Sequence, residues 1–169
     1  MVMAIDTIKF GKNEFKVRDI LAFYDIKDNQ GYHISAHTTL GTRFVCESAT
    51  KEKIEEKMKA INGQLKMVGL ENFAYVGGSI VNIDEVKHVE LETTPWLAST
   101  LEKQVVATFK NETKLTIGDA ISTPAEYESA REVIADYDRQ KTAYRNQAPK
   151  AVDLTSAVAG VIPTTTQDK

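Results

Sequence analysis

One stretch of this chain, Ser79–Leu91, alternates apolar and polar side chains along most of its length. Alternation at every second residue is typical of a β-strand with one buried face, and Asp84 and Glu85 interrupt it as a bend would. A weaker copy of the same pattern, Val17–Ile26, occurs earlier in the chain. The sequence therefore predicts a β-rich fold organised around two related strands.

The elements predicted around these two stretches follow one order: strand, glycine turn, strand, acidic bend, strand, hairpin partner, strand and helix. Gly11 aligns with Gly77 and Asp19 with Asp84, although few residues are identical. We interpret the repeated order as an internal duplication. The predicted strands cover residues 7–10, 14–17, 20–27, 32–37 and 42–47 in the first half, and 73–76, 79–83, 84–91, 105–109 and 113–117 in the second.

Two helices are predicted from spacings of three and four between apolar residues. The first begins near Ser48 or Thr50 and is expected to end at Asn62-Gly63, because glycine commonly follows the last turn of a helix. The second begins with the best local signal of the chain, a capping box between Thr123 and Glu126. The apolar faces consist of Ile54, Met58, Ile61 and Leu65 in the first helix, and Tyr127, Ala130, Ile134 and Tyr137 in the second.

These patterns predict an α+β protein made of two related antiparallel β-rich units, each followed by one packed helix. The first unit covers residues 1–66 and the second residues 67–146, and the pattern leaves open whether they share one sheet or core. Pro149 is expected to end the second helix, since proline inside a helix removes a hydrogen bond. Residues 147–169 are therefore expected to form an extended C-terminal arm.

Composition narrows the class of protein. Hydrophobic residues make up 42% of the 169-residue chain and charged residues 27%, which is ordinary for a globular protein. The net charge of -3 gives no electrostatic reason to expect nucleic acid or an anionic membrane as a partner, but it leaves DNA binding open. No signal peptide is apparent and no run approaches the ~20 apolar residues of a membrane span, so we expect a cytoplasmic protein or one assembled there.

No arrangement of residues in the sequence points to catalysis, a cofactor or a metal. The single cysteine, Cys46, lies in a strand pattern and is expected to be a small core residue. His33 and His37 share one face of a predicted strand but lie about 13 Å apart along it, too far to hold one metal ion. The carboxylates lie at bends and strand ends, where such residues form turns or face solvent: Asp19, Asp25, Asp28, Asp84, Glu85 and Glu90.

Two segments interrupt the repeated order and supply candidate contacts with partners. Residues 92–102 replace a tight turn with a longer loop that carries the only tryptophan, and the apolar C-terminal arm follows the second helix. Long loops often make contacts, although the tryptophan could equally cover the local core. The candidate partner contacts are Trp96, Leu97, Val152, Leu154, Val158, Val161 and Ile162.

The stretch Gly77–Val86, with the hairpin and helix after it, resembles the C-terminal half of a LytTR-type DNA-binding domain. In that family a phrase beginning His-Arg-Ser and continuing through Val-Asn precedes a strand pair. The resemblance covers roughly residues 17–137 and implies a small β-rich fold and duplex DNA binding. However, Gly77-Gly78 stands where the family has its DNA-facing His-Arg. The same pattern of strands and helix also resembles the short flagellar FlbD-like proteins.

We expect a non-enzymatic structural or assembly protein that acts through protein–protein contacts, as a homo- or hetero-oligomer. A phage virion component, associated with the capsid or tail, is the setting suggested by analogy with other small β-rich proteins that carry arms. The alternative is a LytTR-like transcriptional regulator that binds DNA. An enzyme would require a deep pocket lined by Asp84, His88 and Glu90.

Overall fold

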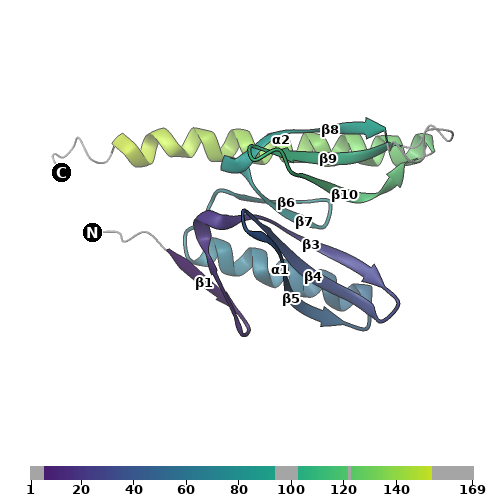
Figure 1. The fold of residues 1–169 in the computed structure, drawn as a ribbon. Coiled ribbons are helices and arrows are strands. Elements are labelled where there is room, and N and C mark those ends of the chain that lie inside the picture. Colours follow the sequence, from purple (N-terminus) through teal and green to yellow (C-terminus); the bar gives the residue numbers. More distant parts are fainter. Residues whose placement is uncertain (1–5, 94–102, 122, 154–169) are drawn as a thin grey trace. The chain divides into compact units, whose positions relative to one another are not determined.

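The chain forms a mixed α+β protein with antiparallel sheets and two α-helices, as the sequence predicts (Figure 1). The structure is a computed structural model, and it describes residues 6–93, 103–121 and 123–153. The chain divides into two compact units, residues 1–137 and 138–169. No observation tests the predicted domain boundaries after residues 66 and 146, which stay predictions.

Seven elements follow one another in the first half of the chain and recur in the same order in the second, where η denotes a short 3-10 helix. The first series is β1 (Thr7–Phe10), β2 (Asn13–Lys16), η1 (Val17–Asp19), β3 (Ile20–Asp28), β4 (Gly31–Thr38), β5 (Gly41–Ser48) and α1 (Lys51–Met67). The second series is β6 (Phe73–Val76), β7 (Ser79–Asn82), η2 (Ile83–Glu85), β8 (Val86–Thr93), β9 (Lys103–Phe109), β10 (Lys114–Ile121) and α2 (Pro124–Asp153).

From β1 to the start of β3 the two series are separated by a constant 66 residues, so that Val17 corresponds to Ile83. The alignment made from sequence is correct at Gly11 and Gly77 but is one residue short at the acidic bend. Asp19 is the last residue of η1, and its counterpart at the end of η2 is Glu85 rather than Asp84. The bend itself was predicted, but its conformation as a turn of 3-10 helix was not.

The strands form three antiparallel sheets. The largest has the order β5-β4-β3-β7-β6, so a hairpin from the second series completes a sheet from the first (Figure 1). Ala22 and Phe23 of β3 pair with Val81 and Ile80 of β7. A second sheet has the order β10-β9-β8, and the hairpin β1-β2 forms a two-stranded sheet of its own. The two series therefore share a sheet, which the sequence left open.

Both series contain a register shift at the same place. In the β3-β4 ladder it lies between Ile20 and Ala22, and in the β8-β9 ladder between Val86 and His88. An extra residue in one strand of an antiparallel pair is a β-bulge, which bends the strand and increases its twist. The strand after each 3-10 turn is therefore bent at the corresponding residue in the two series.

Helix α1 begins as predicted and ends later. The side chain of Thr50 accepts a hydrogen bond from the amide of Lys53, which caps the first turn. Gly63 lies inside the helix, so the prediction that it ends α1 is wrong. The helix ends before Gly69, whose φ of 85° lets the amide of Leu70 reach the carbonyl oxygen of Leu65 at 2.9 Å. Burial of Leu65 explains the extension, because it continues the apolar face past Gly63.

Helix α2 begins at the predicted capping box. The Thr123 hydroxyl accepts from the Glu126 amide at 3.3 Å, and the Glu126 carboxylate accepts from the Thr123 amide at 3.0 Å. The prediction that Pro149 ends the helix is wrong, because α2 continues to Asp153, so residues 147–153 are helical and do not form an extended arm. The alanines and lysine around this proline favour helix, which offsets its missing hydrogen bond.

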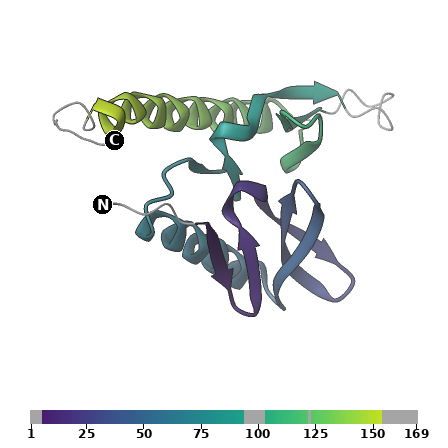
Figure 2. The ribbon, with the colours of Figure 1, turned by 60° about the vertical axis from the view of Figure 1, so that its left-hand side comes forward.

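Helix α1 lies against the five-stranded sheet (Figure 2), and the main hydrophobic core includes buried residues of both. Ile54, Met58, Ile61 and Leu65 are all buried, so the apolar face predicted from their spacing is confirmed. The opposite side of β4 carries His37, whose ring lies 5.4 Å from that of Phe109 in β9. Its Nε2 atom lies 2.8 Å from the Thr113 hydroxyl, so a polar contact also links the two sheets.

The N-terminal hairpin β1-β2 packs its apolar side on this core. Phe10 and Phe15 are both buried, and their ring centroids lie 5.2 and 6.2 Å from that of Phe23. The guanidinium of Arg43 in β5 lies 4.4 Å from the Phe15 ring and donates a 2.9 Å hydrogen bond to the Glu14 carbonyl oxygen. Because a two-stranded hairpin alone is at most marginally stable, these contacts hold it in place.

Candidate functional site

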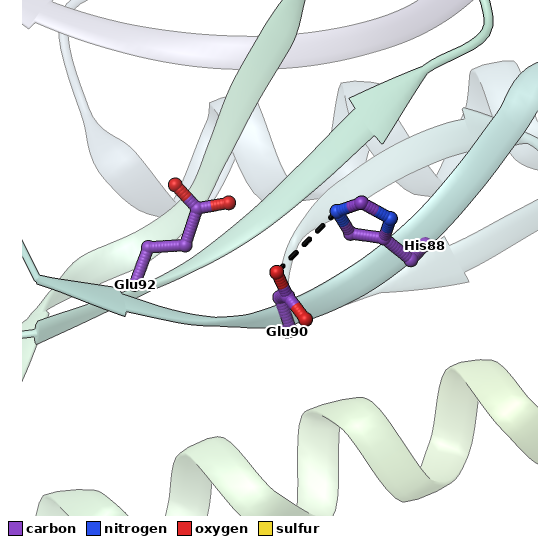
Figure 3. Close-up of side chains that lie close together, drawn as sticks. All are labelled: His88, Glu90 and Glu92. Carbon is purple, nitrogen blue, oxygen red and sulfur yellow. Dashed lines mark ion pairs between the residues drawn. The ribbon is translucent and has the colours of Figure 1, made fainter.

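Strand β8 is the most distinctive surface element of the second series. It forms one side of its three-stranded sheet, and within the described residues no strand pairs with its other edge. Side chains alternate along a strand, so His88, Glu90 and Glu92 project from the same face (Figure 3). His88 and Glu90 are exposed and Glu92 is partly buried. The strand therefore presents both an open backbone edge and a row of polar side chains.

The row has the chemistry of a cation ligand set. One ligand atom from each of the three side chains lies within 4.8 Å of the others, and the His88 Nε2 atom lies 3.4 Å from Glu90 (Figure 3). Imidazole nitrogen and carboxylate oxygens are common ligands of divalent metals. The sequence did not predict this cluster, although the spacing of two between its members is the signal that would have found it.

An ion pair with a lysine opposes metal binding at this row. The Lys114 ammonium forms a 2.9 Å ion pair with Glu92, which neutralises the third member. Beside the row, Lys87 bonds the exposed Glu112 carboxylate at 2.9 Å and lowers its pKa. Exposed acidic groups are frequent on strand surfaces without any ion, so geometry alone does not make this row a metal centre.

The buried side chain of Asn82 stabilises the joint at which β3 pairs with β7. The Asn82 amide group donates a 2.9 Å hydrogen bond to the Ile20 carbonyl, and its oxygen accepts from the Asp84 amide and from the Asn72 side chain. Only 4% of Asn82 is exposed, so each of these bonds replaces one that water would otherwise make. Asn82 therefore fixes both the added hairpin and the 3-10 turn after it.

A cavity of about 680 Å³ opens beside this joint. Its lining includes Asp25, Lys51, Glu55 and the phenol of Tyr75. Burial, followed by the charges of Glu55 and Asp25, raises the pKa of Tyr75. Neither Asp84, His88 nor Glu90, the three residues named for an enzyme pocket, is among the lining of this cavity.

The histidines and the cysteine named from the sequence lie apart. His33 lies 3.4 Å from Asp28, whereas His37 contacts Thr113. Burial lowers the pKa of His37 and raises the pKa of Cys46, so both side chains favour their neutral forms. Cys46 is partly buried against the main core, as expected of a small packing residue.

The candidate partner contacts remain predictions. Val152 lies in the last turn of α2, and its side chain is outside the described residues. The other six also lie outside the described residues: Trp96, Leu97, Leu154, Val158, Val161 and Ile162.

Comparison of the chain with protein-family models, curated proteins and solved structures returned no match. The likeness to LytTR-type and FlbD-like proteins therefore stays a prediction. Among the described residues, no helix has the length and apolar character needed to cross a membrane.

Proposed function

We propose that this protein is a non-enzymatic structural or assembly protein that acts through protein–protein contacts. One observation supports the proposal most directly: the hairpin β6-β7 joins β3 as an added strand pair, while the corresponding edge of β8 has no strand beside it in the described residues. Strand addition to an open sheet edge is a recurrent mode of recognition between proteins, since main-chain hydrogen bonds provide the affinity.

We also propose that the two series arose by duplication of one unit consisting of a hairpin, a 3-10 turn, three strands and a helix. Beyond element order, corresponding backbone hydrogen bonds support this. Val17 N bonds Asp6 O at 2.9 Å, and 66 residues later Ile83 N bonds Asn72 O at 2.7 Å. The last residue of each 3-10 turn also accepts a bond from the hairpin that follows it, Thr39 to Asp19 and Lys110 to Glu85.

A duplicated unit that joins its neighbour through a sheet edge suits a repetitive assembly. A phage capsid or tail component is the setting we propose, by analogy alone. For the DNA-binding alternative, the stretch that carries the resemblance offers two glycines in place of His-Arg, and Gly77 lies close to Ile117. A gel-shift titration at low salt tests that alternative, because phosphate contacts weaken steeply as salt rises.

Crosslinking within the cells that produce the protein tests the main proposal. Tagged full-length chain is crosslinked, purified under denaturing conditions and analysed by mass spectrometry. We expect crosslinks from β8 to protein, either to another copy or to a different chain. Recovery of the protein without crosslinks to any protein, itself included, would refute the proposal, provided that a known oligomer in the same cells is captured.

A further inference from the structure

Strand β8 lacks, within the described residues, a partner that its counterpart has. β3 is paired on both sides, with β4 and with β7, whereas β8 is paired with β9 alone. The two strands begin 66 residues apart, after corresponding 3-10 turns, and carry the same bulge. The pairing of β3 with β7 is therefore a template for what could occupy the open edge of β8.

The template specifies which backbone groups are available. Gly77 and Gly78, both with positive φ, close β6-β7 as a two-residue turn between Val76 and Ser79. Since hydrogen-bonded and non-hydrogen-bonded pairs alternate in an antiparallel ladder, the amide and carbonyl of Ile80 face β3, opposite Phe23. The residue that corresponds to Phe23 is Val89, so its amide and carbonyl face the open edge of β8.

The counterpart of β7 is β2, which belongs to the two-stranded sheet at the N-terminus. Glu14 occupies the position of Ile80, and the register of the β1-β2 hairpin turns its amide and carbonyl away from β1. The Arg43 guanidinium bonds that carbonyl at 2.9 Å, as expected for a group on an outer edge. An added strand would compete with Arg43 for this one acceptor.

Charge distinguishes the two edges and favours their contact. Residues 7–18, around the hairpin, contain four lysines and arginines and one glutamate, a formal net charge of +3. Residues 84–93, which span the end of η2 and β8, contain four aspartates and glutamates and one lysine, a net charge of -3 with neutral histidine, of which the Lys114 ammonium offsets the charge of Glu92. Opposite potentials steer two surfaces together and suppress pairing of like edges.

We propose that the hairpin β1-β2 of one copy adds to the open edge of β8 of a second copy, in the register of the internal joint. Glu14 then lies opposite Val89 of the second copy, and Phe15 lies opposite His88. This inference rests on the proposed function and names the partner as another copy of the chain. Because the two surfaces differ, the contact is head-to-tail and forms either a closed ring or an open filament.

Disulfide trapping between two chains tests the register. Both chains carry Cys46→Ser; one also carries Glu14→Cys, and the other carries Val89→Cys together with a tag that changes its size. Directly opposed residues lie about 5.5 Å apart between Cα atoms, within the range that a disulfide spans. We expect a mixed dimer under mild oxidation.

The matched control replaces Val89→Cys with Leu91→Cys, two residues along the same edge. This moves the thiol by about 7 Å, beyond the reach of a disulfide, so trapping should fall at least severalfold. Equal trapping at the two positions, or trapping at neither, overturns the proposed joint.

Sedimentation of the full chain provides an independent test of the proposed self-association. We expect association that depends on protein concentration and weakens as salt rises. Val89→Pro should abolish this association, whereas the control Thr42→Pro, which places a proline on the edge strand β5, should retain it. Circular dichroism checks that both variants fold, and if either does not, the trapping result decides. A monomer at all concentrations overturns this inference, whereas the function proposed above fails only if crosslinking in cells captures no protein at all.

Discussion

Replacing Gly77 with alanine probes how closely the β6-β7 hairpin packs on its neighbours. A Cβ atom built at this position would lie 2.6 Å from the Cγ2 atom of Ile117 and 3.3 Å from Val133. Real Cβ atoms do not approach that closely, so the hairpin or the Ile117 side chain has to shift, and overpacking of this kind costs about 1–3 kcal/mol. The left-handed backbone, with a φ of 56°, adds about 1–2 kcal/mol for a residue with a side chain.

Gly11→Ala is the matched control, because Gly11 is the counterpart of Gly77 in the first series. Its φ is 62°, and nothing lies within 4 Å of a Cβ placed there. The backbone contribution therefore cancels between the two variants. We expect Gly77→Ala to lower the free energy of unfolding by about 1–3 kcal/mol more than Gly11→Ala does.

Urea denaturation followed by far-ultraviolet circular dichroism measures both values. A third variant, Ile117→Leu, lacks the γ2 methyl group and should reduce the effect of Gly77→Ala when the two are combined, giving a coupling energy of about 1 kcal/mol. Equal destabilisation by Gly77→Ala and Gly11→Ala would refute the close contact. A double variant with strictly additive losses would show that Ile117 is not the group that is struck.

Three further predictions concern single side chains. Asn82→Ala should lower the free energy of unfolding by about 2–3 kcal/mol in urea titration, because it leaves a buried carbonyl of β3 without its donor. A loss below about 0.5 kcal/mol, which is the contribution of a weak hydrogen bond, would contradict this. Burial lowers the pKa of His37, so stability should be full above the ordinary histidine value of 6.5 and fall as pH drops through it, and His37→Gln should flatten that slope. Arg43→Met, whose apolar chain can still pack on the Phe15 ring, should tighten self-association about tenfold in sedimentation by releasing the Glu14 carbonyl, whereas weaker association would argue against competition there.

Local chemistry made most of the elements predictable from sequence. Thr50 and the Thr123–Glu126 pair mark both helix starts, and the paired glycines after Val76 mark a hairpin, since each acts within a few residues. The helix ends were wrong for a physical reason. Gly63 and Pro149 are poor helix residues, but tertiary burial and good helix-forming neighbours outweigh the preference of one residue.

What the sequence could not provide is pairing between distant segments. Nothing near Ile80 indicates that it lies beside Phe23, because strand partners are chosen by the whole sheet. The row on β8 was within reach, since alternation places His88, Glu90 and Glu92 on one face. The ion pair of Glu92 with Lys114, which argues against a metal there, could not be predicted from sequence. It depends on the pairing of β8 with β9 and of β9 with β10.

The bulge that β3 and β8 share determines which face of the sheet each later side chain of the strand occupies. Because side chains alternate with a period of two, the extra residue decides which of them face inward along everything that follows. In the first series this residue is Leu21, which is buried, and in the second it is Lys87, which is exposed. Deleting Lys87 would remove the bulge but leave Val86 opposite Phe109 and His88 opposite Thr108, so His88, Glu90 and Glu92 would keep their face. A single-residue deletion at the bulge would therefore straighten β8 without exchanging its two surfaces, whereas a deletion beyond the bulge would turn the residues after it to the opposite face.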